Sequence, residues 1–154
     1  LLDYLTKRWA LSALPGKEIK VIGSFLKLEL TSNTGAAFGL GAKNGGIFLS
    51  LFAIAASCLV VYYAPFITSK AWSWVFALVL GGALGNVSDR VFNSPGLFRG
   101  PVTDWIVLPH WPNFNIADSA IVCAAILAFI LSARNITPIV KLNNQDHNQG
   151  GRSA

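Results

Sequence analysis

Long apolar stretches dominate the middle and the end of the chain. Residues 46–66 carry no charge and are long enough for a membrane span of about 20 residues. Residues 71–88 and 119–133 are two further stretches of this kind, and the last is entered through Asp118. We predict one membrane-spanning helix in each of these three ranges.

A shorter helix is predicted at the amino end. Residues 1–14 have the pattern of the outer end of a helix that Pro15 and Gly16 stop. Asp3 and Lys7 are four residues apart, so they share a helical face and predict a local ion pair. We expect this first helix to be truncated at its amino end, which makes four transmembrane helices with both termini on one side.

The pattern changes to a period of two before the first long apolar stretch. Leu26, Leu28 and Leu30 alternate with polar residues, which is typical of a half-buried strand. We therefore predict a small extramembrane β-sheet after the first helix, in a β region at about 17–44.

The composition agrees with an α-helical integral membrane protein. Of 154 residues, 53% are hydrophobic and 12% are charged, against roughly 25% charged residues in soluble domains. The net charge is +5, but the basic residues are scattered, which favours contact with anionic lipid headgroups over nucleic acid. We predict a single four-helix membrane domain at 1–142 and a disordered polar tail at 143–154.

The two cysteines do not indicate a metal site. Cys58 and Cys123 each lie in an apolar stretch, and the chain has no CxxC or Cys/His metal spacing. We expect buried free thiols that pack as small hydrophobic side chains.

Polar residues of the types used in catalysis gather between positions 81 and 118. Asp89, Asp104 and Asp118 are three of the seven acidic residues in the chain. A charged side chain at membrane depth costs about 2.5–3.5 kcal/mol, so such residues are rarely without function. Asn86 and Asn115 each precede one of these acids by three residues, which places each pair on one helical face.

Two carboxylates close together cannot both ionise cheaply, so they share a proton, and one acts as base while the other acts as acid. Such a pair can activate water against an amide, which is the chemistry of aspartyl proteases. The permanent charge of Arg90 is expected to hold its neighbour Asp89 ionised and structural. Asp104 and Asp118 have no charged neighbour in the sequence, so we predict that they form the catalytic pair.

Two other interpretations of the acids stay open. A small transporter or channel subunit would use them as a proton relay, although the two halves of the chain show no internal repeat. A scaffold protein would use them as polar ties between helices. Asp104→Asn would alter ion flux in the first case and stability alone in the second.

Five blocks of residues, in order along the chain, resemble the lipoprotein signal peptidases, also called signal peptidase II. The blocks are DYLTKRW at 3–9, NTGAAFG at 33–39, GGALGNVSDR at 81–90, VTDW at 102–105 and FNIADSAI at 114–121. The chain departs from the family pattern in several places. Tyr4 stands where Gln is usual, and Ser32 stands where Arg is common. The block at 102–105 differs from the family's V-V-D-F by two substitutions, and the loop between Asp89 and Asp104 is longer than usual.

The resemblance implies an intramembrane aspartyl protease that uses Asp104 and Asp118 and no cofactor or metal. Its substrate would be a diacylglyceryl-modified prolipoprotein, cleaved before the lipidated cysteine. The implied supporting residues are Asn33, Gly35, Asn86, Asp89, Arg90 and Asn115, with Asp3 and Lys7 as structural residues.

The resemblance also implies the surroundings of the enzyme. We expect a monomer in the bacterial cytoplasmic (inner) membrane, in contact with membrane lipids, with its site toward the outer face and open to globomycin-type inhibitors. The strand region and the 91–101 loop are expected to clamp the peptide, while the apolar spans receive the acyl chains.

Overall fold

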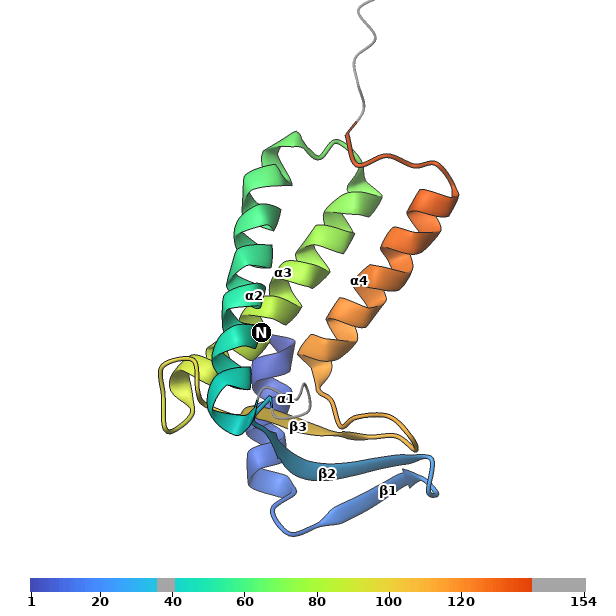
Figure 1. Ribbon diagram of the computed structural model, residues 1–154. Helices are drawn as coiled ribbons and strands as arrows, with labels where there is room; N and C mark the ends of the chain where they lie inside the picture. The colour runs from blue at the N-terminus through green and yellow to red at the C-terminus, as the bar shows by residue number, and fades with distance from the viewer. Residues whose placement is uncertain (36–40, 140–154) are drawn as a thin grey trace, which may run out of the picture.

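Three long helices lie side by side, with a small sheet and a short helix at one end of them (Figure 1). The computed structural model describes residues 1–35 and 41–139, except for the side chains of 41–44. The elements in chain order are α1 (Leu2–Ala13), β1 (Glu18–Ile22), β2 (Leu26–Asn33), α2 (Gly41–Tyr63), the 3-10 helix η2 (Ala64–Phe66), α3 (Lys70–Phe92), β3 (Val102–Val107) and α4 (Ile116–Ala133). The predicted tail at 143–154 and most of the small-residue motif at 33–39 lie outside the described residues.

Three helices of the described chain are long and apolar enough to cross a membrane. They cover Gly45–Phe66, Lys70–Phe92 and Ile116–Ala133, which confirms the three apolar spans predicted from the sequence. The 12 residues of α1 are fewer than the roughly 20 that a bilayer core requires. A fourth span therefore stays a prediction.

The sheet has three antiparallel strands in the order β1-β2-β3. Strands β1 and β2 confirm the small sheet predicted after the first helix. The predicted β region at 17–44 is wrong at its far end, because β2 ends at Asn33 and α2 begins at Gly41. The sequence interpretation also missed β3. The first four residues of this strand, Val102–Trp105, are all buried, so β3 lacks the alternation that marks a half-buried strand.

A small apolar cluster holds α1 against the sheet. Ala10 of α1 and Leu14, the C-cap of this helix, are fully buried against Trp105 of β3. Trp9 lies edge-on to Trp105 with 5.5 Å between the ring centroids, a geometry worth about 0.5–1.5 kcal/mol beyond area burial. This contact fixes α1 relative to β3, and each of these two elements supplies side chains to the polar site.

Glycines allow α3 to approach α4 closely. A Cβ atom on Gly82 would lie 2.5 Å from the carbonyl oxygen of Ala117, and one on Gly85 would lie 3.1 Å from the Ala117 Cβ. A Cβ atom on Gly81 would meet open space. The close contact therefore runs through Gly82 and Gly85, which bring the helix backbones together.

The two cysteines are free, as predicted, but they are exposed on the surface of α2 and α4 rather than buried. The prediction of burial failed because these helices are apolar on most sides. An apolar stretch of this kind does not distinguish a side facing protein from a side facing lipid.

We predict that Gly82→Ala destabilises the protein while Gly81→Ala does not. The added methyl group at position 82 would force α3 and α4 apart, and overpacking of this kind costs about 1–3 kcal/mol. At position 81 the methyl group meets open space, so the better helix propensity of alanine should leave stability unchanged or raise it by about 0.5–1 kcal/mol. Thermal unfolding in detergent compares the two variants, and equal midpoints would contradict the close contact at Gly82.

Candidate active site

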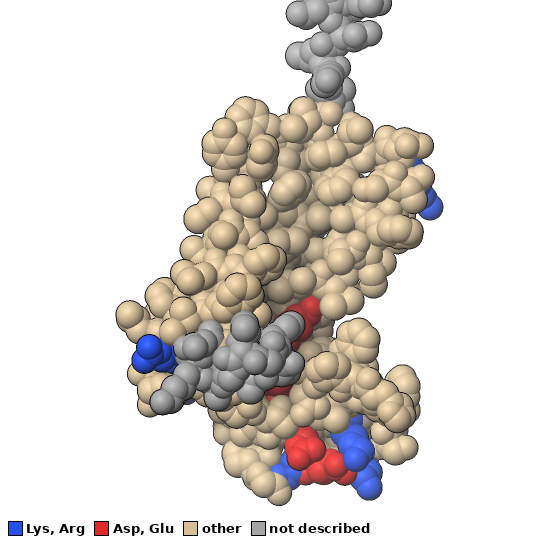
Figure 2. Space-filling model, in the orientation of Figure 1, with Lys and Arg blue, Asp and Glu red and all other residues tan. Residues whose placement is uncertain are grey.

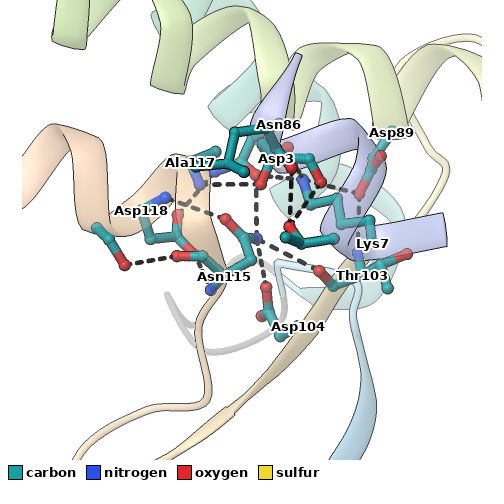
Figure 3. A network of polar contacts seen from close by, with 12 residues as sticks. Asp3, Lys7, Asn86, Asp89, Thr103, Asp104, Asn115, Ala117 and Asp118 are labelled. Carbon is teal, nitrogen blue, oxygen red and sulfur yellow. Dashed lines mark hydrogen bonds and ion pairs between the residues drawn. The ribbon is translucent and has the colours of Figure 1, made fainter. Parts of the chain in front are cut away.

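Polar side chains converge where the lower ends of α3 and α4 meet α1 and β3 (Figure 3). Asp118 and Asn115 come from the start of α4, Asp104 from β3, and Asn86 from α3. The two acids predicted as a catalytic pair thus come from different elements, and both bind Asn115.

Asp104 is buried, with 1% of its surface exposed, and amides contact both of its oxygens. Asn33 donates to Oδ2 at 3.0 Å, and Asn115 donates to Oδ1 at 2.7 Å. Burial raises the pKa of Asp104 to about 6, and the charge of Asp118 adds to the rise. The two amide hydrogen bonds and the charge of Lys7 oppose this rise. A carboxyl in this state can exchange a proton near neutral pH.

Asp118 is held by the start of its own helix. Asn115 is the N-cap of α4: its side chain accepts from the Asp118 N–H at 3.0 Å, and its own N–H donates to Asp118 Oδ2 at 3.2 Å. This reciprocal capping box satisfies two backbone donors that a helix start leaves free. Asn86 donates to the other oxygen, Oδ1, at 2.7 Å. The cap therefore orients Asp118 and leaves the Asn115 amide group free to donate to Asp104.

A glycine turn sets the orientation of Asn33. The side-chain oxygen of Asn33 accepts from the Gly35 N–H at 2.9 Å, so its amide nitrogen faces Asp104. Gly35 has φ +82°, and a Cβ atom there would lie 3.0 Å from the backbone of Gly45 and Gly46. Both the left-handed backbone and the close approach require glycine.

Lys7 lies behind the acids and is 3% exposed. Its ammonium group contacts Asp3 Oδ2 at 2.7 Å, Asp89 Oδ2 at 3.1 Å and Asn86 Oδ1 at 3.1 Å. The ion pair with Asp3 that the sequence predicted is therefore present. The two contacts with α3 were not foreseen, because no local spacing links residue 7 to residues 86 and 89. With three donors and three acceptors, the ammonium group is fully satisfied.

Asp3 ties α1 to both long helices of the site. Its Oδ1 accepts from the Ala117 N–H at 2.9 Å. A Cβ atom on Gly85 would lie 2.8 Å from Asp3 Oδ2, so only glycine at position 85 admits this carboxylate.

Among the described residues, Asp89 forms its ion pair with a cation other than its neighbour Arg90. Asp89 pairs with Lys7 and accepts from the Thr103 N–H at 2.9 Å. Neighbouring residues on a helix point about 100° apart, so Arg90 turns away from Asp89 toward α2. There its Nη1 would lie 3.1 Å from a Cβ atom on Gly46. Arg90 is 5% exposed, and within the described part of the chain its Nη1 has no hydrogen-bond partner.

A pocket of about 360 Å³ opens beside the acids. Its lining includes four of the residues that the sequence singled out, Asn33, Asn86, Arg90 and Asp118. Its remaining lining residues are Leu49, Ser50, Ala53, Val87, Val102, Trp111, Pro112, Asn113, Phe114 and Val122. In Figure 2, acidic atoms reach the surface in the recess between the helices and the sheet. The site thus joins an apolar cavity to a small set of polar groups, as ligand sites commonly do.

The structure brings together all the residues that the sequence singled out, although through some unforeseen contacts. Thr103 and Ala117 were missed, because they contribute backbone N–H groups and these leave no trace in residue type. The α2 side of the pocket, at Leu49, Ser50 and Ala53, was missed as well. The residue pattern of an uncharged apolar helix does not indicate which of its faces lines a cavity.

Comparison with known proteins agrees with the fold. Residues 1–134 match the family model described as signal peptidase (SPase) II. The lipoprotein signal peptidase of Streptomyces coelicolor is 42% identical over 142 residues, which cover 90% of this chain and 68% of the relative. That of Rhodococcus jostii is 41% identical over 137 residues, which cover 88% and 69%.

Two solved structures are also similar. One is a bacterial membrane enzyme solved by the in meso method at 2.3 Å resolution, with a TM-score of 0.73 and 28% identity over 92% of this chain and 87% of that one. The other, solved by the same method at 1.9 Å, has a TM-score of 0.72 and 29% identity over 87% and 86%. A family match over most of the length, together with a shared membrane fold, leads to one conclusion: this chain belongs to the signal peptidase II family.

Proposed function

We propose that this protein is an aspartic endopeptidase that removes signal peptides from diacylglyceryl-modified prolipoproteins by cleaving before the lipidated cysteine. The observation that carries the proposal is the position of Asn115, which donates to both Asp104 and Asp118 from one buried residue. Two carboxyls that contact the same residue lie in one neighbourhood, and in the proposed mechanism they act together on one water molecule.

The two acids have different surroundings, and this suggests their roles. Asp118 lines the pocket, whereas Asp104 is buried and carries a raised pKa of about 6. In the proposed reaction Asp118 takes a proton from water as the water oxygen attacks the scissile carbonyl carbon. Asp104 gives its proton to the carbonyl oxygen. When the tetrahedral intermediate collapses, the leaving nitrogen takes the proton from Asp118, and Asp104 recovers its own.

The pocket supports binding of a lipidated peptide. Arg90 is buried beside the cavity with a free donor at Nη1 within the described chain, which suits a peptide or ester carbonyl oxygen of the substrate. Asn33 and Asn86 also line the pocket, but their amides already bind Asp104 and Asp118, so they are proposed to support the acids. Globomycin-type inhibitors would occupy the same cavity.

The proposed setting is the bacterial cytoplasmic membrane, with the site near its outer face. A diacylated substrate is confined to the bilayer, so a site at the end of the spans meets its scissile bond at headgroup depth. The outward faces of α2, α3 and α4 are apolar and suit acyl chains. We propose that α1 is the outer end of a fourth span and that the enzyme acts as a monomer.

We predict that Asp104→Asn and Asp118→Asn each lower the rate of cleavage by at least about 10²–10⁴-fold, the usual contribution of a general acid or base. The measurement is a gel shift of a lipidated precursor, with the unlipidated precursor as the substrate control. Glu29→Gln is the matched control variant, because Glu29 is an exposed acid on β2 outside the site.

Normal turnover in either aspartate variant would overturn the proposed mechanism. A variant that unfolds at lower temperature but cleaves normally when folded would favour structural polar ties. Altered proton flux with no proteolysis in the wild-type protein would favour the relay.

We predict that kcat/KM falls as the pH rises through about 6, with one proton lost. Burial raises the pKa of Asp104 to about 6, so below this pH the carboxyl holds the proton that the reaction requires, and above it the proton is lost. Bound substrate excludes water and should move the corresponding limb of kcat to higher pH. Initial rates measured on both sides of pH 6 test this, and a kcat/KM that does not change there would rule out Asp104 as the proton donor.

A further inference from the structure

The loop between α3 and β3, residues 93–101, is closed at its base. Asn93 Nδ2 donates to the Pro101 carbonyl at 2.8 Å, and the Gly100 N–H donates to the Arg90 carbonyl at 3.0 Å. A Cβ atom on Gly100 would lie 2.5 Å from the Asn93 carbonyl oxygen, so the two ends of the loop are in close contact. The loop is therefore a compact projection from the end of α3, as Figure 1 also shows.

The tip of this loop holds two residues in an unusual backbone conformation. Leu97 and Phe98 have φ values of +27° and +66°, which residues with a Cβ rarely adopt. Such conformations persist where the surrounding structure holds them, and they are common at functional segments. Here the conformation presents a leucine outward, with 76% of its surface exposed.

The exposed apolar residues of the loop do not serve the pocket. Residues 91–101 are absent from the described lining of the pocket beside the acids, so the expected role of this loop as a peptide clamp has no support in that lining. Phe92, immediately before the loop, is 82% exposed. Two large apolar side chains, one at the end of α3 and one at the tip of the loop, thus project into the surroundings.

Contacts with α2 give the depth of the loop relative to the membrane spans. Its Phe98 carbonyl oxygen would lie 3.2 Å from a Cβ atom on Gly46, and Ile47 lines a niche together with Leu97 and Phe98. Gly46 and Ile47 are in the first turn of the span Gly45–Phe66, and Phe92 is the last residue of the span Lys70–Phe92. The loop therefore lies beside the ends of two spans rather than beyond them.

We propose that residues 92–99 form an anchor at the membrane interface, with Phe92 and Leu97 inserted among the lipids at the edge of the bilayer. The occupant is a lipid surface because the loop adjoins the outward apolar surface of α2, where Phe48 is 58% exposed. Arg99 is exposed in the same loop, and a guanidinium at headgroup level is attracted to lipid phosphates. The anchor would set the depth of the site in the bilayer. It does not depend on the proposed peptidase reaction.

Spin labels test this depth in vesicles of phosphatidylethanolamine and phosphatidylglycerol. Labels are placed at Leu97→Cys and Phe92→Cys, each in a Cys58→Ala and Cys123→Ala background. The readout is the ratio of collision with dissolved oxygen to collision with a water-soluble nickel chelate. We expect both labels to give a ratio between those of two references.

The native Cys123, in a Cys58→Ala background, is the reference inside the bilayer, because it is exposed near the middle of α4. Ser24→Cys, in the background without native cysteines, is the aqueous reference, because Ser24 is exposed in the turn between β1 and β2. Ratios equal to that of Ser24→Cys at both sites would overturn the anchor. The anchor would also be overturned if Phe92→Cys gave a ratio above the aqueous reference while Leu97→Cys gave a ratio equal to it, because the loop tip would then lie in water.

Discussion

The burial of the Lys7 ammonium group is the constraint on which the rest of the site depends. An ammonium group that is 3% exposed must have every donor satisfied, because an unpaired buried charge is very costly. Its three contacts reach α1 itself and two turns of α3. Meeting this requirement fixes α1 against α3. It also fixes the Asn86 oxygen toward Lys7, so that the Asn86 amide nitrogen faces Asp118.

The acids of this protein fall into two groups with different partners. Asp3 and Asp89 form ion pairs with a cation and accept from backbone N–H groups, so they act as links between elements. Asp104 and Asp118 have no ion pair among the described residues: each accepts from a side-chain amide, and Asp118 also accepts from the Asn115 N–H. Amides orient a carboxyl without supplying a full positive charge, and a carboxyl held in this way can gain and lose a proton more readily than an ion-paired one.

Close backbone contacts explain why a site of several polar groups fits at the end of so small a bundle. Gly82 and Gly85 bring α3 against Ala117 at the start of α4, and Gly85 also admits the Asp3 carboxylate. Gly35 allows a similar close contact between the end of β2 and the start of α2. At each of these positions a side chain would separate the elements whose polar groups must meet. The polar network (Figure 3) therefore depends on residues that make no polar contact through a side chain.

The sequence by itself determined the features that arise within one element. Uncharged stretches of about 20 residues predicted the three long helices, alternation predicted β1 and β2, and spacing predicted the Asp3–Lys7 pair. It also singled out Asp104 and Asp118, since acids without a charged neighbour are conspicuous beside apolar stretches. Only the tertiary structure decided which partners these residues meet. The pairing of Lys7 with Asp89 joins residues far apart in the chain, and β3 is buried on both faces. Neither leaves a local pattern, because both result from packing between separate elements.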